Sequence, residues 1–340
     1  MKAKITTMNR TKGTKLRLLF TGGGGAGTEA LNRLLSDRYE VFFADADRES
    51  KPYMIPSDHW LQIPLARAAE FPGEIADLCR RMQIDLLIPT VDEELLSIAR
   101  LTEPLGFDVL LPPEHFVKRH LDKLVSNQFL HKAGLPAPKT VSACEGRLGF
   151  PCIVKPRCGR GSRNVATVYS EDELKAHITL ARQAPEDFVV QELIIGDEYT
   201  VMMAANRKCK LRAIVPVLVE RKRGITLRAM TLHDEDVIDA CRAIHGADPV
   251  PGCYNIQMIK AADGSASPFE INPRISTTAC LGLAAGVDFV GIFLDLPEAT
   301  VHLRQGLVDF KNCLGLKRTW YNEIMEVVCT LPAFNADTQH

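Results

Sequence analysis

The sequence lacks the features that mark disulfide-rich, zinc-binding and membrane-spanning proteins. Its ten cysteines are scattered with no Cys-x-x-Cys pair, and its nine histidines show no metal-ligand spacing. No run of about 18 uncharged apolar residues occurs. Scattered cysteines favour reduced thiols over disulfides or structural zinc. We therefore expect a cytoplasmic protein that has no membrane partner.

An excess of charge of either sign is also missing. The net charge is −1 over 340 residues, which gives no reason to expect a nucleic-acid partner. The hydrophobic fraction of 46% and the charged fraction of 24% are those of a globular protein long enough for two or three domains. Residues 1–15 are basic and polar, lack the apolar core of a signal peptide, and are expected to form a flexible tail.

Strand and helix patterns alternate over the first hundred residues. This rhythm predicts an α/β domain over residues 16–113, with an open parallel sheet and helices on both faces. The expected strands are Leu16–Phe20, Val41–Ala44, Asp85–Pro89 and Asp108–Leu111, and the expected helices are Thr28–Leu35, Phe71–Met82 and Glu94–Leu101.

Beyond Pro112-Pro113 the pattern changes to α+β. A single helix is expected over Glu114–Ala133, ended by Gly134 and Pro136. Antiparallel strands and a helix follow from Pro138, and further strands predict a second antiparallel sheet. Residues 306–340 carry little pattern and are expected to form a C-terminal tail.

The segment Cys253–Arg274 contains two strand patterns around Asp263-Gly264, a dipeptide that favours a tight hairpin turn. With a two-residue turn, Gln257 lies opposite Glu270 on one face. By the same register, the polar face also carries Asn255 opposite Asn272, and the apolar face carries Ile256, Met258, Phe269 and Ile271.

The polar face of this hairpin combines one carboxylate with three amides, and Arg274 follows the second strand. Hard cations such as Mg²⁺ take oxygen ligands and are commonly shared with substrate phosphates, which an arginine also binds. The alternative is the solvated outer face of an edge hairpin.

Two glycine-rich segments are candidates for binding a nucleotide. Gly22–Gly27 follows a strand, opens a helix and contains G-x-G-x-x-G, with Asp45 at the end of the next strand. This is a dinucleotide fingerprint, although a tight turn above a parallel sheet favours glycine in any case. The loop Gly159–Asn164 follows Lys155 and also contains two arginines, which suits phosphate binding or a solvated basic loop.

The segment from Gln191 to Glu198 is a candidate for binding adenosine. An extended backbone can bind the adenine edge, and a carboxylate a few residues further on can accept both ribose hydroxyls. Taken singly, Glu192 and Glu198 are equally compatible with surface acids.

The order of these segments resembles the ATP-grasp superfamily, and within it the group of the carbamoyl-phosphate synthetase large subunit, over roughly residues 16–300. In that family two α+β subdomains close on ATP after an N-terminal α/β domain. The resemblance implies a pre-ATP-grasp domain over 16–113 and an ATP-grasp domain over 114–305, with a lid at about 136–193.

The resemblance also implies roles for matching residues. The lysines would contact phosphates, residues 159–164 would form a flap over them, the 192–194 segment would hold adenine, and Glu198 would bind the ribose. The implied ATP-binding residues are Lys123, Lys155, Gly159, Gly161, Ser162, Gln191, Glu192, Leu193, Ile194 and Glu198. The implied metal ligands are Gln257, Glu270 and Asn272, and Arg274 would stabilise the transferring phosphate.

Position 257 departs from the commoner family pattern, in which an acid fills it. Glutamine occurs there in the carbamoyl-phosphate synthetase group, and it leaves one fewer charge for metal. The family also assigns the N-terminal domain to a wall of the substrate site. The expected substrate residues are Asp92, Glu93, Ser276 and Thr277, and the basic candidates near them are Arg221, Lys222, Arg223 and Arg228, of which Arg228 is preferred as catalytic.

The resemblance implies an ADP-forming carboxylate–amine ligase that acts through an acyl phosphate. Its cofactors would be ATP and Mg²⁺, with Mn²⁺ as a substitute, and its partners a small-molecule carboxylate and amine, with a homodimer left open. Two alternatives remain. One is a non-catalytic ATP-binding protein of the same fold, and the other is an NAD(P)-dependent dehydrogenase that uses Gly22–Gly27 and Asp45.

Overall fold

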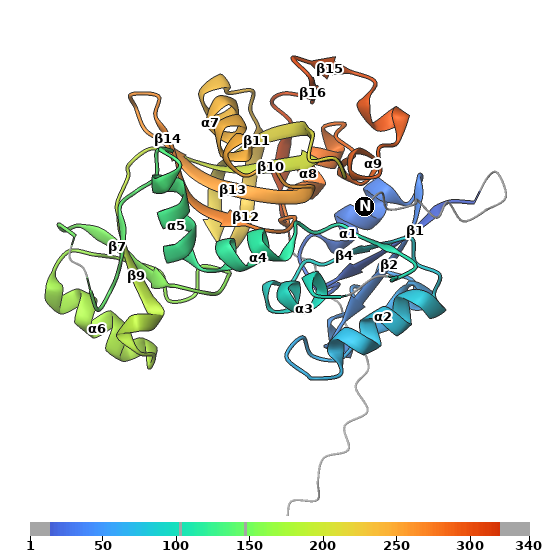
Figure 1. Ribbon diagram of the computed structural model, residues 1–340, viewed down its shortest axis with the longest axis horizontal. Coiled ribbons are helices and arrows are strands. Elements are labelled where there is room, and N and C mark those ends of the chain that lie inside the picture. The colour runs from blue at the N-terminus through green and yellow to red at the C-terminus, as the bar shows by residue number, and fades with distance from the viewer. Residues whose placement is uncertain (1–13, 102–103, 146–147, 320–340) are drawn as a thin grey trace, which may run out of the picture.

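The N-terminal part of the chain forms a parallel sheet in the computed structural model, which describes residues 14–101, 104–145 and 148–319 (Figure 1). The strand order is β3-β2-β1-β4-β5, and every neighbouring pair is parallel. The elements are β1 (Leu16–Thr21), α1 (Thr28–Leu35), β2 (Tyr39–Asp45), β3 (Trp60–Gln62), α2 (Phe71–Arg81), β4 (Leu86–Ile88), α3 (Leu95–Ala99) and β5 (Asp108–Val109). The open parallel sheet is as predicted, and the short strand β3 is an addition to it.

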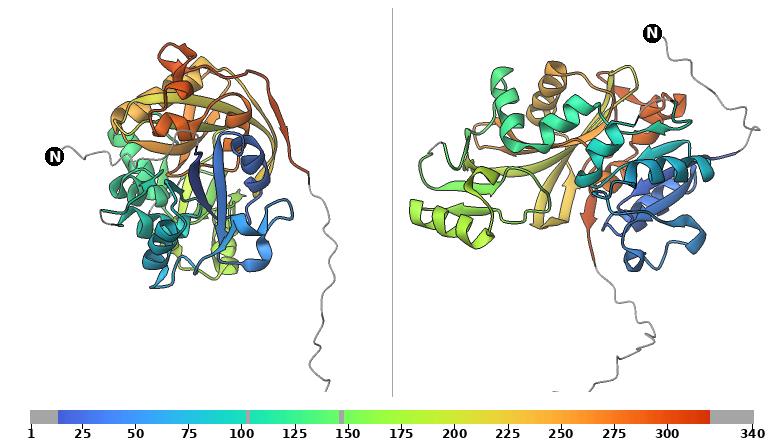
Figure 2. Two further views of the ribbon diagram at one scale, coloured as in Figure 1. Left: turned by 90° about the vertical axis from the view of Figure 1, so that its right-hand side faces the viewer. Right: turned by 60° about the horizontal axis from the view of Figure 1, so that its bottom comes forward.

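A small antiparallel sheet forms within the segment predicted as the lid, and that name is kept for it. Figure 2 shows it on the opposite side of the central sheet from the N-terminal domain. Its strand order is β6-β9-β7-β8, and apolar side chains of the helix α6 pack on it. The elements are β6 (Thr140–Ser142), β7 (Cys152–Pro156), β8 (Ala166–Val168), α6 (Glu171–Ala181) and β9 (Phe188–Glu192).

The central sheet is antiparallel and has the strand order β14-β13-β10-β11-β12-β17. The strands are β10 (Asp197–Ala205), β11 (Leu211–Arg223), β12 (Ile225–Thr231), β13 (Gly252–Lys260), β14 (Ala266–Asn272) and β17 (Gly315–Lys317). Together the sheets and helices confirm the predicted α/β and α+β class, with an open parallel sheet followed by two antiparallel sheets.

Each face of the central sheet belongs to a different hydrophobic core. Val201 and Met203 of β10 pack in one core with the helix α7 (Glu235–Ala247). Met202 and Ala204 of the same strand pack in another core with α8 (Ala279–Ala284), α9 (Phe289–Phe293) and strands β1 and β2. Because this second core includes side chains of the N-terminal sheet, the two domains are joined by continuous apolar packing.

The single helix expected over Glu114–Ala133 is wrong: the chain forms α4 (Glu114–Leu121) and α5 (Lys123–Lys132). Asp122 separates them with extended backbone angles, and its carboxylate accepts hydrogen bonds from the N–H groups of Leu124 and Val125. An aspartate at this position satisfies N–H groups that a helix start leaves unpaired. The break puts Lys123 at the first position of α5.

No helix within the described part of the chain combines the length and apolar character needed to cross a membrane.

The hairpin β13–β14 has the expected register at its functional end. Gln257 pairs with Glu270, and Asn255 pairs with Asn272. The two-residue turn is wrong, since Lys260 pairs with Ala266. Two departures from the predicted hairpin cancel each other. The loop is one residue longer than expected, and Phe269 is an extra residue opposite the Gln257/Met258 step, so the pairing beyond Phe269 is the predicted one.

The bulge at Phe269 turns this side chain away from the face predicted for it. Ile256, Met258 and Ile271 are fully buried in the core beneath α7, as expected. Phe269 is only half-buried and lies in a cavity on the opposite face of the hairpin. Bulges re-aim side chains in this way because they add one residue to one strand only.

The segment predicted as a C-terminal tail contains strands within its described part. The hairpin β15 (Leu303–Arg304) and β16 (Leu307–Val308) crosses the boundary predicted at residue 305, and β17 extends the edge of the central sheet. Arg318, just after β17, donates hydrogen bonds to the carbonyls of Thr226, Thr277 and Ala26. This arginine therefore links the central sheet to the glycine loop of the N-terminal domain.

The opposite orientations of Ile271 and Phe269 predict different effects on stability. Ile271→Ala should lower the free energy of unfolding by about 2–5 kcal/mol, because it leaves a cavity in the core. Phe269→Ala should cost only about 1 kcal/mol, the typical effect of a substitution outside the core. Chemical denaturation of both variants measures the difference, and equal losses would contradict the bulge geometry.

Candidate functional site

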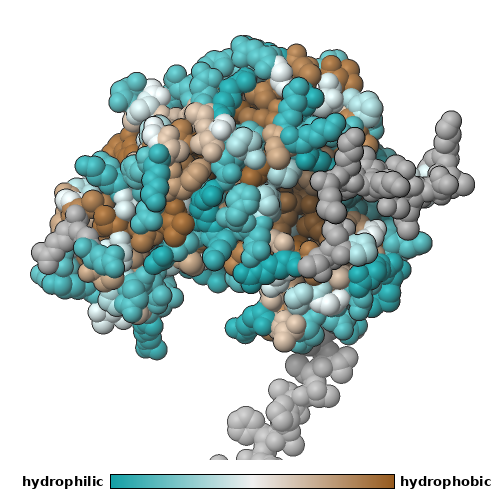
Figure 3. Space-filling model, in the orientation of Figure 1, coloured by the Kyte–Doolittle hydropathy of each residue, from teal (hydrophilic) through white to brown (hydrophobic). Residues whose placement is uncertain are grey.

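Two adjoining cavities lie between the domains. The first, here called the lid cavity, lies between the lid and the central sheet and has a volume of about 610 Å³. The second, here called the domain cavity, lies between the central sheet and the N-terminal domain and measures about 870 Å³. Figure 3 shows the surface hollowed between the lid and the N-terminal domain. The residues that line both cavities include Glu93, Arg160, Arg163, Lys222, Gln257 and Glu270.

Glu270 lies in the wall between the cavities and is surrounded by cations. Desolvation alone would raise the pKa of this carboxyl. The opposing charges of Lys123, Lys155, Lys222 and Arg274 outweigh that effect and hold the pKa below its ordinary value. Glu270 is therefore ionised at neutral pH, and the four cations exceed its single charge.

Lys155 is the buried cation of this group. Its Nζ atom is 2.8 Å from Gln191 Oε1 and 3.2 Å from the carbonyl oxygen of Phe269, to both of which it donates. The side chain is only 4% exposed. Burial lowers its pKa to about 8, the charge of Glu270 raises the pKa, and the neighbouring lysines lower it further. The ammonium is charged at neutral pH, and it shares the negative charge of Glu270 with Lys123, Lys222 and Arg274.

Lys222 contacts both Glu198, which was predicted to bind the ribose, and Gln257, which was predicted to bind metal. Its Nζ donates to Glu198 Oε1 at 2.7 Å and to Gln257 Oε1 at 3.2 Å. Lys222 was one of several basic candidates in the sequence, and the structure places it in the walls of both cavities.

The preferred candidate, Arg228, lies elsewhere. It is 67% exposed, pairs with Glu220 at 2.7 Å and lines neither cavity. Its position therefore does not support the catalytic role expected for it. The reason is a break in strand alternation, since Thr226 and Ala229 share a face although two residues separate them.

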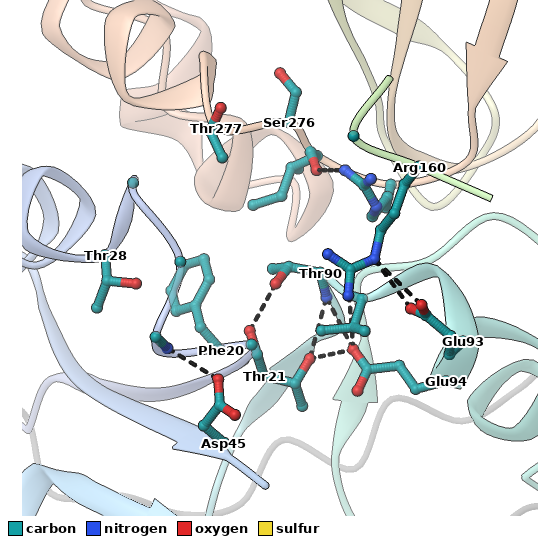
Figure 4. A pocket seen from close by; sticks show the side chains of 18 of the residues that line it. Phe20, Thr21, Thr28, Asp45, Thr90, Glu93, Glu94, Arg160, Ser276 and Thr277 are labelled. Carbon is teal, nitrogen blue, oxygen red and sulfur yellow. Dashed lines mark hydrogen bonds and ion pairs between the residues drawn. The ribbon is translucent and has the colours of Figure 1, made fainter. Parts of the chain in front are cut away.

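The flap residues lie over the junction of the cavities. Gly159 and Gly161 have positive φ angles of +113° and +74°, a backbone conformation that glycine adopts readily. The carbonyl oxygen of Gly159 accepts a hydrogen bond of 2.8 Å from Lys123 Nζ. Arg160 pairs with Glu93 of the N-terminal domain at 3.1 Å, as Figure 4 shows.

Glu93 and Asp92, both predicted as substrate residues, differ in position. Glu93 lines both cavities and binds the flap. Asp92 lines neither cavity, and its carboxylate accepts a hydrogen bond from Arg274 Nε. Since both groups are largely buried, Asp92 holds the guanidinium of Arg274 at the edge of the domain cavity.

The segment predicted for adenine forms one wall of the lid cavity. Gln191, Glu192, Leu193, Ile194 and Glu198 all line it. Glu192 is tied to the chain before β6, because its N–H donates to the carbonyl of Lys139 and its carboxylate accepts from the N–H of Lys139. The flap glycines and Ser162 line the same cavity.

Three N–H groups of the glycine loop in the N-terminal domain already have protein acceptors. The N–H groups of Gly23 and Gly25 donate to backbone carbonyls, and that of Gly24 donates to Asp45 Oδ2 at 2.9 Å (Figure 4). Asp45 also accepts from the N–H of Asp47. A dinucleotide phosphate needs such N–H groups, and a ribose needs such a carboxylate, so this geometry does not favour the dehydrogenase interpretation.

The predicted substrate residues Ser276 and Thr277 line the domain cavity from the central sheet's side (Figure 4). The carbonyl of Thr277 accepts a hydrogen bond from Arg318 at 2.9 Å, which fixes this loop against the N-terminal domain. Sequence patterns gave no signal for Arg318 or for Phe269, whose ring lies 5.2 Å from Lys155 Nζ.

The oxygen atoms around Glu270 fit a magnesium ion carried on a phosphate. Glu270 offers one carboxylate, Gln257 and Asn272 offer amide oxygens, and Mg²⁺ takes oxygen ligands. No group of three or more His, Cys, Asp and Glu residues suited to a metal occurs within the described ranges. This donor set therefore suits an ion that gets its other ligands from a nucleotide.

Two family models match the chain, each over part of its length. One, described as "ATP-grasp in the biosynthetic pathway with Ter operon", covers residues 184–311, and "D-ala D-ala ligase C-terminus" covers residues 124–225. The carbamoyl phosphate synthase large chain of Methanothermobacter thermautotrophicus is 24% identical over 291 residues, which are 76% of this chain and 27% of that protein. The chain thus spans about a quarter of the length of such relatives.

Solved structures share the fold. A carboxyaminoimidazole ribonucleotide synthase from Aspergillus clavatus, complexed with ATP, has a TM-score of 0.65 at 16% identity, over 86% of this chain and 80% of that one. An L-amino acid ligase from Bacillus licheniformis has a TM-score of 0.63 at 17% identity, over 84% of this chain and 74% of that one.

The pKa of Lys155 predicts how phosphate binding depends on pH. The charged ammonium binds an anion, and it loses its proton as the pH rises through about 8. We expect affinity for ATP to be constant below this value and to fall about tenfold per pH unit above it. Isothermal titration calorimetry measures this profile. Lys155→Met should bind weakly with no such inflection, and an inflection that persisted in the variant would assign it to another group.

The Arg160–Glu93 pair predicts the accessibility of the flap. An exposed ion pair contributes up to about 1 kcal/mol, so Glu93→Gln should speed tryptic cleavage at flap arginines by roughly two- to fivefold. The control is Glu114→Gln, which removes an exposed ion pair with Arg100 far from the flap. Equal cleavage rates in both variants would mean that Glu93 does not hold the flap.

Proposed function

Because the chain is an ATP-grasp protein homologous to the large chain of carbamoyl phosphate synthase, we propose that it is an ATP-dependent ligase that joins a carboxylate to an amine. The observation that carries this proposal is Glu270, ionised among four cations in the wall shared by two cavities. A group transferred from one cavity to the other would pass this point.

The lid cavity is proposed to hold ATP. Its volume of about 610 Å³ suits a nucleotide, and small-molecule sites commonly measure about 300–1,000 Å³. Lys123 and Lys155 would bind phosphates, the backbone of Glu192–Ile194 would bind adenine, and Glu198 would bind the ribose. Phe269 projects into this cavity and offers an apolar surface for the base.

Magnesium, or manganese in its place, would be held by Glu270 and Asn272, with Gln257 beside them. A bound ion would neutralise charge that develops on the transferring phosphate. The chain's own cations contribute to the same task, since Arg274 is fixed by Asp92 and Lys155 by Gln191.

The domain cavity is proposed to hold the small-molecule carboxylate and the amine. A carboxylate oxygen attacks the γ-phosphorus of ATP, ADP departs with the electrons of the broken P–O bond, and an acyl phosphate forms. The amine nitrogen then attacks the acyl carbon, phosphate leaves with the original carboxylate oxygen, and the nitrogen loses a proton. Closure of the flap by Arg160 and Glu93 would exclude water from the acyl phosphate.

Release of ADP tests the proposed reaction. Mg-ATP with panels of carboxylates and amines should give ADP for at least one pair, and ¹⁸O in the carboxylate should appear in the phosphate. Glu270→Ala should abolish turnover, whereas Glu220→Ala, whose carboxylate pairs with Arg228 outside both cavities, should leave it unchanged. ATP binding without ADP release across a broad panel would favour the non-catalytic alternative, and phosphate without ¹⁸O would exclude an acyl phosphate.

A further inference from the structure

Lys222 is held at the junction of the cavities by two acceptors. Its Nζ lies 2.7 Å from Glu198 Oε1 and 3.2 Å from Gln257 Oε1. The side chain is 25% exposed and lines both cavities. It is also one of the cations that lower the pKa of Glu270.

The strand places Lys222 here through a bulge. Val219 pairs with Ala229 and Arg221 with Arg228, so Glu220 is an extra residue on β11. With unbroken alternation Arg221 would share the face of Val219, but the bulge gives that face to Lys222. In keeping with this shift, Arg221 is exposed and lines neither cavity.

The ammonium of Lys222 is hydrogen-bonded to Gln257 Oε1, an oxygen predicted to bind metal. A magnesium ion binds its ligand oxygens at about 2.0–2.1 Å. An ion on Gln257 Oε1 would therefore lie within about 5 Å of Lys222 Nζ, which is itself 3.2 Å from that oxygen. Two cations so close repel each other strongly, so Gln257 binds either the lysine or a metal.

Few protein oxygens remain for metal when Gln257 binds Lys222. Without Gln257, Glu270 and Asn272 are left, and Glu270 is the only carboxylate among the three predicted ligands. Mg²⁺ is commonly bound through one or two protein groups together with substrate phosphates. A second divalent ion would have no carboxylate of its own in this set.

We infer that Lys222 is a built-in catalytic cation that takes the place of a second divalent ion, so that the chain uses one Mg²⁺ per ATP. This inference rests on the proposed function, because it concerns the same ATP site. Lys222 supplies a fixed positive charge at the point where the transferring phosphate passes from the lid cavity to the domain cavity.

Counting bound metal tests the inference without knowledge of the substrates. Electron paramagnetic resonance measures Mn²⁺ bound per protein in the presence of a non-hydrolysable ATP analogue. The wild-type protein should bind one Mn²⁺, and Lys222→Met combined with Gln257→Glu should bind two. Lys118→Met, which removes an exposed lysine outside both cavities, should bind one with unchanged nucleotide affinity.

Single variants keep the test decisive if the double variant does not fold. Lys222→Met should bind one Mn²⁺ and weaken binding of the analogue about tenfold or more, whereas Gln257→Glu should pair with Lys222 and still bind one. Two Mn²⁺ in the wild-type protein, or unchanged nucleotide binding in Lys222→Met, would overturn the inference. Failure of the wild-type protein to bind the analogue at all would instead overturn the proposed function.

Discussion

The site depends on the electrostatic attraction between the carboxylate of Glu270 and the cations that surround it. Four cations act on this one carboxylate, and they come from α5, the lid, the central sheet and the loop after β14: Lys123, Lys155, Lys222 and Arg274. Two further carboxylates, Glu198 and Asp92, pair with Lys222 and Arg274. The four cations still outnumber the three carboxylates, and an excess of positive charge attracts phosphates. A site built this way needs few acidic residues, since a nucleotide brings the negative charge with it.

The N-terminal domain holds two arginines near the site in place. Asp92 of the N-terminal domain binds Arg274, and its neighbour Glu93 binds the flap through Arg160. The continuous core between β1, β2 and the central sheet fixes the distance across which these pairs form. The N-terminal domain is therefore more than a wall of the domain cavity: through Asp92 it determines where Arg274 lies at the edge of that cavity.

Much of the fold and part of the site could be predicted from the sequence. The alternation of strands and helices gave the parallel sheet, and the order of motifs gave the family, because both depend on local patterns. The pairing of Gln257 with Glu270 was right although the turn was not, since the bulge at Phe269 compensates for a longer loop. The break at Asp122 was missed because the apolar stripe continues across it, and a cap is visible only in its contacts with Leu124 and Val125.

What the sequence could not predict lies mainly where strand alternation fails. Alternation assigns side chains to faces only while each residue has one partner, and an extra residue reverses every assignment beyond it. Glu220 and Phe269 are such residues, and each stands within two positions of a site residue, Lys222 or Glu270. Bulges cost ladder hydrogen bonds, so their presence in both strands beside the junction has a local reason. At β11 the bulge turns Lys222 rather than Arg221 toward the junction of the cavities, and at β14 it turns an aromatic ring and a backbone carbonyl toward Lys155.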